Sequence, residues 1–351
     1  AYNGLLLLSF VLTGYATYLF IAYLTADRLA GVVAGAIFGF CSYRMHAMAA
    51  GWLPLISTQW IPLTFLYVER MFREGKARYA AGSGLFMALN ILSSWYYLYV
   101  VGSFVALYVL VRLWPWLRSL RQAMVWRNLA LLAAVTGLLV VPIALPVLRA
   151  GQGGMGWSLA DVEKWAASLE DFVLPNVYHP LWGRYFLQQR AYTLRYPWYA
   201  PGFVYLGWVP LVLAAAGLFW RKAPARIKAP MVWLGALSFV MALGVVLHWN
   251  NSVVEVPVPP ALETLMARGM STLMTKLAFH KASYYNITFR SGAVPIPLPA
   301  LLVYLFVPLG NALRTLYRFG VITMFAVTAL AGLGVARLLG NSRIREGGPS
   351  S

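Results

Sequence analysis

Two carboxylates in a long polar segment are the first groups whose types and spacing could do chemistry. Asp161 and Glu163 are two residues apart within residues 149–200, which begin with several glycines. A carboxylate pair can act as a general base or ligate a divalent metal. The simpler interpretation is a short amphipathic helix, Leu159–Phe172, whose acidic face lies in water. Asp-x-Glu spacing alone does not separate these two interpretations.

Two arginines near the C-terminal end of the chain form a second candidate site. Arg314 and Arg318 are four residues apart, so on a helix they would share one face. They precede a long apolar run, at a helix N-terminus where free N–H groups and the helix dipole favour an anion. Two guanidinium groups there suit a phosphate or diphosphate. The alternative is that both side chains extend to lipid headgroups.

A third group of polar residues surrounds the turn 42–59. Arg44 and His46 follow one apolar run and Gln59 precedes the next. Polar groups at membrane depth are costly and often line a cavity, so we expect these three residues to line one. A hydrogen-bonded structural role is the alternative for each of them.

The composition identifies the solvent in which these residues must be positioned. Of 351 residues, 61% are apolar or aromatic and 11% are charged, whereas soluble domains carry about 25% charged residues. Most of the surface is therefore expected to face lipid. The net charge of +18 is explained by topology signals and anionic lipids rather than by nucleic acid. The single cysteine, Cys41, excludes an internal disulfide and a Cys-rich metal site.

The apolar runs predict an all-α transmembrane bundle of about nine spans with two long outer loops that carry short interfacial helices. Short basic connectors hold 16 of the 28 Lys and Arg residues, which places these connectors in the cytoplasm and the long loops outside. We expect five segments: an N-terminal bundle of about six spans, an outer loop, a two-span hairpin, a second outer loop, and a final span with a basic tail (1–148, 149–200, 201–249, 250–316 and 317–351). In the second loop, Ala261–Leu277 is predicted to be an interfacial helix, and Leu301–Val307 is a candidate re-entrant segment.

Several short motifs give the chain a family resemblance. It resembles the GT-C superfamily of bacterial membrane glycosyltransferases in motifs distributed over most of its length: Gly35-Ala36-Ile37-Phe38-Gly39-Phe40, Tyr43-Arg44, Ser57-Thr58-Gln59-Trp60, Ser94-Trp95-Tyr96-Tyr97, Tyr205-Leu206-Gly207, Asn311-Ala312-Leu313-Arg314 and Leu330-Ala331-Gly332-Leu333-Gly334. The resemblance implies transfer of a sugar from a polyprenyl-phosphate carrier at the outer face of the bacterial inner membrane, sometimes with a divalent metal such as Mg²⁺ or Mn²⁺. In that superfamily the main catalytic carboxylate lies in the first outer loop, and the loop that would carry it is expected to precede Ala1.

The leading hypothesis is therefore a GT-C-type glycosyltransferase. In it, Arg314 and Arg318 hold the lipid-linked phosphate, Arg44, His46 and Gln59 line the sugar cavity, and Asp161 or Glu163 acts as a secondary acid/base or metal ligand. The rival hypothesis is a non-catalytic scaffold subunit of a larger membrane complex, for which the small-residue helix faces are suited. Acidic residues and lysines are nearly absent from the spans, which argues against an ion-coupled transporter.

Overall fold

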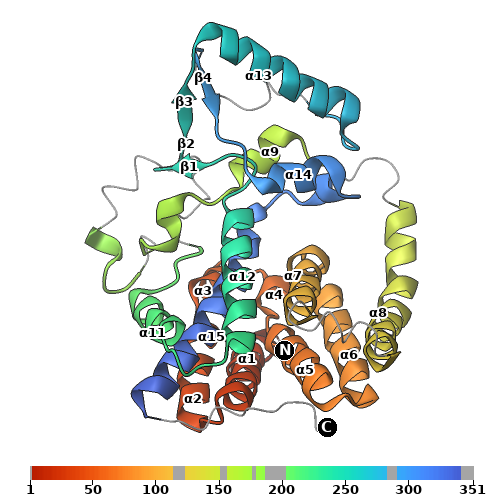
Figure 1. The fold of residues 1–351 in the computed structure, drawn as a ribbon, viewed down its shortest axis with the longest axis vertical. Coiled ribbons are helices and arrows are strands. Elements are labelled where there is room, and N and C mark those ends of the chain that lie inside the picture. Colours follow the sequence, from red (N-terminus) through yellow and green to blue (C-terminus); the bar gives the residue numbers. More distant parts are fainter. Residues whose placement is uncertain are drawn as a thin grey trace. The chain divides into compact units, whose positions relative to one another are not determined.

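The computed structural model describes residues 2–113, 123–150, 156–175, 179–185, 203–282 and 291–340 (Figure 1). The chain forms two compact units. Unit 1 contains residues 1–149, 206–236 and 322–351, and unit 2 contains residues 150–205 and 237–321. Of the predicted outer loop 149–200, residues 151–155, 176–178 and 186–200 lie outside the described parts of the chain.

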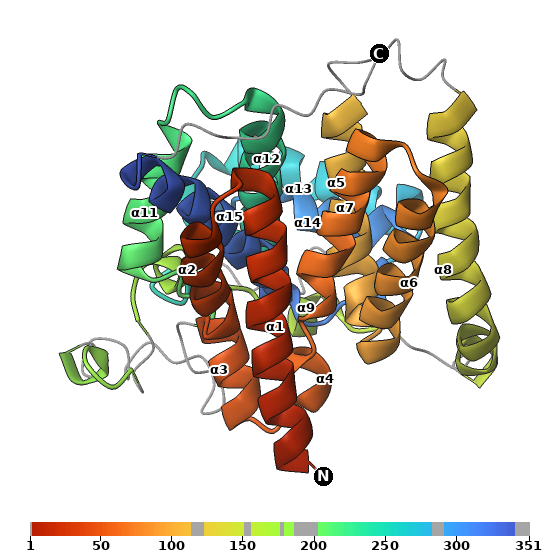
Figure 2. The same ribbon diagram turned by 90° about the horizontal axis from the view of Figure 1, so that it is seen from below.

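Unit 1 is built from helices. These are α1 (Tyr2–Thr25), α2 (Arg28–Gly39), α3 (Ser42–Ala49), α4 (Leu53–Ile56), α5 (Trp60–Glu74), α6 (Ala77–Ser93), α7 (Tyr96–Leu113), α8 (Ala123–Ala150), α11 (Trp208–Leu218), and most of α12 (Ala225–Ala242) and α15 (Gly320–Leu338). Helices α1 and α2 lie side by side (Figure 2). They pack closely because Gly35 faces the backbone of Gly14, where an added Cβ would lie 2.6 Å from the Gly14 carbonyl oxygen.

Local signals explain where several of these helices begin and end. Asp27 caps α2, because its side chain accepts a hydrogen bond from the Ala30 N–H at 3.0 Å. Gly75 ends α5 in the left-handed conformation, with φ of 67°. The apolar residues 79–113 form two helices, since α6 and α7 are separated by the extended residue Ser94.

An aromatic cluster forms the centre of unit 1. The ring of Phe325 on α15 lies 5.3 Å from that of Phe20, 5.5 Å from that of Phe38 and 5.1 Å from that of Phe65. All four side chains are fully buried. Helix α15, near the C-terminal end of the chain, is therefore held against α1, α2 and α5 by one set of ring contacts.

Unit 2 combines short helices with two small antiparallel ladders. Its elements are α9 (Leu159–Lys164), η2 (Leu169–Phe172), β1 (His248–Trp249), β2 (Ser252–Val253), β3 (Glu255–Pro257), α13 (Pro260–Thr272), η3 (Leu273–Leu277), β4 (Ala293–Pro295), α14 (Pro299–Phe306), η5 (Gly310–Ala312) and η6 (Leu316–Phe319). Strand β1 pairs with β2, and β3 pairs with β4. Helix α13 and its continuation η3 cover the predicted helix Ala261–Leu277, and no residue of α13 is buried; the interfacial position of this helix stays a prediction.

The all-α prediction is confirmed, whereas the count of nine spans is not. Among the described residues, five helices are long and apolar enough to cross a membrane: Tyr2–Thr25, Tyr96–Leu113, Ala123–Pro146, Ala225–Ala242 and Leu316–Leu338. The other four predicted spans correspond to shorter helices, α2, α5, α6 and α11, of 12, 15, 17 and 11 residues. These four helices are shorter than a typical span of about 20 residues, so the structure does not confirm them as spans.

Candidate functional site

Arg314 in unit 2 lies against two tryptophan rings. Its guanidinium carbon is 4.2 Å from the ring centroid of Trp157 and 5.3 Å from that of Trp165. The Nε atom is buried and has no hydrogen-bond partner among the described residues. No carboxylate of the described chain forms a salt bridge with this side chain. A cation held by aromatic rings and without an acidic partner is suited to bind an anion.

Backbone contacts hold the two tryptophans beside Arg314. The Trp157 N–H donates to the carbonyl of Asn311 at 2.9 Å, and the Tyr304 hydroxyl donates to the carbonyl of Trp157 at 2.9 Å. The Tyr317 N–H donates to the carbonyl of Trp165 at 3.3 Å. Residues on and after α14 therefore fix both rings, although Tyr304 and Trp157 are 147 positions apart in sequence.

The predicted fork of Arg314 and Arg318 on one helix face is wrong. Arg314 lies in a non-helical step between η5 and η6, while Arg318 lies on η6. Helix α15 begins only at Gly320. Residues 313–315 are not helical, so a spacing of four residues does not place Arg314 and Arg318 on one helix face. Both arginines are half-buried in unit 2.

Asp161 lies at the start of α9, close to the same elements. Its Oδ2 atom accepts a hydrogen bond from the Ser158 hydroxyl at 2.6 Å, and its Oδ1 atom is 3.9 Å from Nζ of Lys164. The side chain is 43% exposed, so a ligand can reach it. Burial and the negative charge of Asp161 raise the pKa of Tyr304, the residue that holds Trp157.

Glu163 forms a buried pair with a residue that the sequence did not connect to it. Its Oε1 atom is 2.7 Å from Nε2 of His248 on β1, 85 positions away. The His248 side chain is fully buried and that of Glu163 is 16% exposed. No motif links the two residues, so only the fold shows the pair. Asp161 and Glu163 thus have different environments, one open and one paired.

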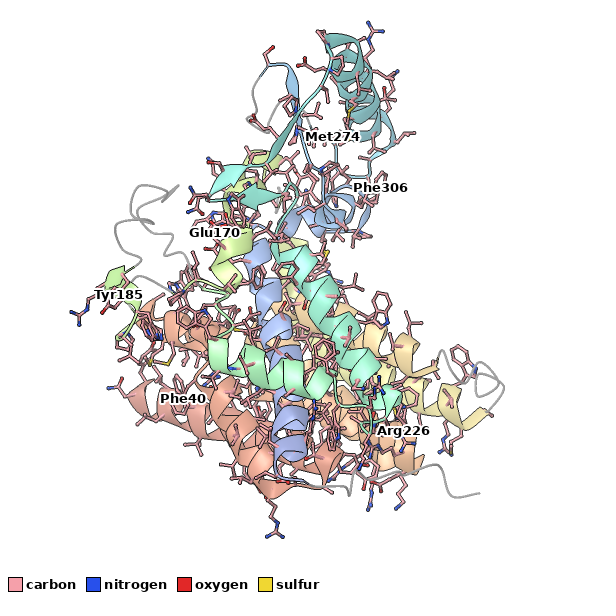
Figure 3. The ribbon with its side chains drawn as sticks, turned by 60° about the vertical axis from the view of Figure 1, so that its left-hand side comes forward. Phe40, Glu170, Tyr185, Arg226, Met274 and Phe306 are labelled. Carbon is pink, nitrogen blue, oxygen red and sulfur yellow. The ribbon has the colours of Figure 1, made fainter. Side chains whose placement is uncertain are left out.

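The predicted amphipathic helix Leu159–Phe172 is also wrong. Helix α9 ends at Lys164, and a separate 3-10 turn, η2, carries Glu170 and Asp171. Asp171 is fully buried, and its Oδ2 atom accepts from the Ser168 N–H at 2.9 Å. Glu170, labelled in Figure 3, is 8% exposed. These acidic groups do not form a water-facing stripe, because they lie within the core of unit 2.

The described carboxylates do not form a metal site. Among the described residues no group of three or more His, Cys, Asp or Glu side chains could hold a metal ion. Asp161 is hydrogen-bonded to Ser158, and Glu163 is paired with His248. This donor set does not fit a divalent cation, which takes six or more oxygen ligands.

In unit 1, Arg44 is a structural group rather than a cavity-lining one. It is fully buried, and its three guanidinium nitrogens donate to backbone carbonyls and hydroxyls. The partners are Gly39, Ile56, Thr13, Thr58 and Ser9, on or beside four helices. Burial lowers the pKa of Arg44 to about 10, so it stays charged at neutral pH. The buried Gln59 accepts from Ser9 at 3.0 Å and belongs to the same network.

His46 on α3 is half-buried, and its ring lies 5.5 Å from that of Trp52. Burial lowers its pKa from 6.5 to about 4. The unfolded chain therefore binds the proton first, and the stability that the neutral ring contributes is lost as the pH falls from 6.5 to 4.

We expect the Tm of the His46→Gln variant to fall less than that of the wild type between pH 6.5 and pH 4. Thermal unfolding at about pH 8 and at steps down to about pH 4 measures the difference; parallel curves would contradict this prediction.

These features define a helical protein with apolar helices of membrane-spanning length and an aromatic-flanked arginine site in unit 2. The chain belongs to the family described as a domain of unknown function (DUF6311), which it matches over residues 2–269. Asp161, Glu163 and His248 lie within the matched region. No curated protein matches the chain. No solved structure matches it either.

Proposed function

We propose that this chain is a membrane glycosyltransferase of the GT-C type. It transfers a sugar from a polyprenyl-phosphate carrier at the outer face of the bacterial inner membrane. The observation that supports this proposal is Arg314, a cation in contact with two tryptophan rings and without a carboxylate partner in the described chain. Such a group favours a phosphate ester, which is the leaving group of this reaction.

The reaction needs a group that stabilises the departing phosphate, a base that accepts a proton, and residues that bind the sugar. Unit 2 has residues suited to the first two. An acceptor hydroxyl attacks the anomeric carbon, and the bond from that carbon to the phosphate oxygen breaks. Arg314 stabilises the charge that develops on the departing phosphate. The exposed Asp161 carboxylate accepts the proton of the acceptor hydroxyl. The residues that bind the sugar stay unassigned. Arg44 and Gln59 are buried in unit 1, where other groups of the chain already use their hydrogen bonds.

The test compares two arginine variants of the purified chain in lipid nanodiscs. Donors are polyprenyl-phosphate glucose, mannose and arabinose, and the readout is release of free polyprenyl phosphate. We expect Arg314→Gln to lower kcat/KM about 10- to 100-fold, since a charge-assisted hydrogen bond contributes about 1.5–3 kcal/mol. Arg268→Gln, on the exposed helix α13, removes the same charge in unit 2 and is expected to leave turnover unchanged.

Two outcomes would reject the proposal. One is equal turnover by the wild type and the Arg314→Gln variant, which would show that Arg314 takes no part in the reaction. The other is a wild-type chain that turns over none of the three donors.

The second outcome favours the scaffold alternative. The observation on its side is α8, since only 6% of its most apolar stretch is buried among the described residues. Lipid or another membrane subunit must cover that surface.

A further inference from the structure

A cluster of arginines in unit 1 surrounds one buried carboxylate and has not been assigned a role. Glu69 on α5 is 1% exposed, and it pairs with two arginines. Arg73, one turn later, places Nε 2.6 Å from Oε1. Arg112, in the last turn of α7, contacts both carboxylate oxygens at 3.0 and 3.1 Å. Tyr108 donates to Oε2 at 2.7 Å, so the carboxylate is fully bonded.

The cluster holds more positive charge than Glu69 can neutralise. Arg70 adds a third guanidinium, and its Nε atom is buried without a hydrogen-bond partner among the described residues. The Arg73 side chain is 6% exposed, and its Nη2 atom is likewise buried without a partner in the described chain. Within this cluster, two arginines pair with Glu69, and Arg70 lies against the same tyrosine ring as Arg73. Unpaired donors on buried cations are costly unless a ligand completes them.

The two unpaired donors belong to neighbouring guanidinium groups. Arg70 and Arg73 are three residues apart on α5 and so share a helix face. Their guanidinium carbons lie 4.9 and 5.0 Å from the centroid of one ring, that of Tyr23 on α1. Arg70 is half-buried, which gives access from the surface. The Tyr23 ring thus contacts both guanidinium groups.

We propose that Arg70 and Arg73 form a binding site for the phosphate group of an anionic phospholipid. Planar guanidinium groups match phosphate oxygens, and two of them compensate the charge of the headgroup. The depth is also suitable, because Arg112 is the penultimate residue of the candidate span Tyr96–Leu113. Charged groups at the end of a span lie at the level of the headgroups. The distribution of Lys and Arg predicts that this end faces the cytoplasm, where anionic lipids attract basic clusters.

The site is independent of the transferase proposal, since its residues lie in unit 1 and the proposed reaction uses residues of unit 2. Glu69 has a defined part in it. By pairing with Arg73 and Arg112, the carboxylate offsets part of the positive charge, while Arg70 Nε and Arg73 Nη2 are left without a partner among the described residues. Without a ligand, this arrangement retains a net positive charge.

Native mass spectrometry of the purified chain tests the proposal, with phosphatidylglycerol and phosphatidylcholine titrated separately. The wild type is expected to retain one phosphatidylglycerol in preference to phosphatidylcholine. Arg70→Gln is expected to weaken that binding about tenfold, because it removes one charge-assisted contact. Lys76→Gln is the matched control: it removes the same charge from a nearby side chain that is 57% exposed, and it is expected to bind as the wild type does.

Arg70→Lys separates charge from geometry and protects the test against misfolding of the first variant. It keeps the positive charge but loses the planar donor pair, so we expect an intermediate affinity. Equal weakening by Arg70→Gln and Lys76→Gln would reduce the effect to surface charge and overturn the proposal. Equal retention of both lipids would overturn it too.

Inorganic phosphate is the third probe. If inorganic phosphate binds in an Arg70-dependent way while phosphatidylglycerol does not, the ligand is a free phosphate and the proposal of a lipid headgroup is wrong.

Discussion

Replacing Arg44 by methionine is expected to lower the free energy of unfolding of unit 1 by about 3–5 kcal/mol, the range seen when a buried charged network loses a member. The cation connects the end of α2, through the Gly39 carbonyl, to Thr13 on α1 and to Thr58 beside α4. Its guanidinium carbon also lies 4.4 Å from the ring centroid of Phe10. Methionine fills much of the volume but leaves these buried oxygens without donors.

The measurement is the midpoint of unfolding in a denaturing detergent, followed by tryptophan fluorescence. Arg28→Met is the control, because it removes an exposed arginine at the start of α2 and is expected to change stability by less than about 0.5 kcal/mol. Arg44→Lys should fall between them, since a lysine ammonium cannot donate in three separate directions as a guanidinium does. A wild-type midpoint for Arg44→Met would show that these hydrogen bonds do not stabilise unit 1.

Helix positions followed from sequence wherever the chain carries a strong local signal. The break at Ser94 is an example, because the polar and aromatic residues 93–97 interrupt an apolar run and an extended residue ends the helix there. The number of spans did not follow. Helix α2 ends after 12 residues, where the apolar run Leu29–Phe40 gives way to the polar stretch that carries Arg44. The sequence therefore showed where this helix ends, but an apolar run of that length is shorter than a typical span of about 20 residues.

The candidate site was only partly predictable for a related reason. Arg314 stood out by its type and position, but its tryptophan neighbours come from residues 157 and 165, and no local rule connects these segments. The same holds for His248, which pairs with Glu163 through the fold of unit 2 alone. Arg44 shows the opposite error. An arginine between apolar runs suggests a functional role, although hydroxyls and carbonyls nearby can satisfy it completely.

Helices α11 and α15 meet at two glycines, and alanine at either position is expected to cost more than about 3 kcal/mol. A Cβ on Gly334 would lie 1.9 Å from the carbonyl oxygen of Leu213, and one on Gly217 would lie 2.0 Å from that of Leu330. Both obstacles are backbone, so no side chain can rotate away. The helices would have to separate by roughly 1 Å or more, and α15 also carries Phe325 at the centre of the core.

Gly137→Ala on α8 is the matched control for Gly334→Ala. It makes the same exchange in an apolar helix, but no atom lies within 4 Å of the added Cβ. Alanine there should stabilise the helix by about 0.5–1 kcal/mol through its higher helix propensity. Opposite shifts of the unfolding midpoint in the two variants are therefore expected. If Gly334→Ala behaved like Gly137→Ala, the close approach of α11 and α15 could not exist in the membrane, and the Gly-x-Gly motif at residues 332–334 would need another explanation than packing.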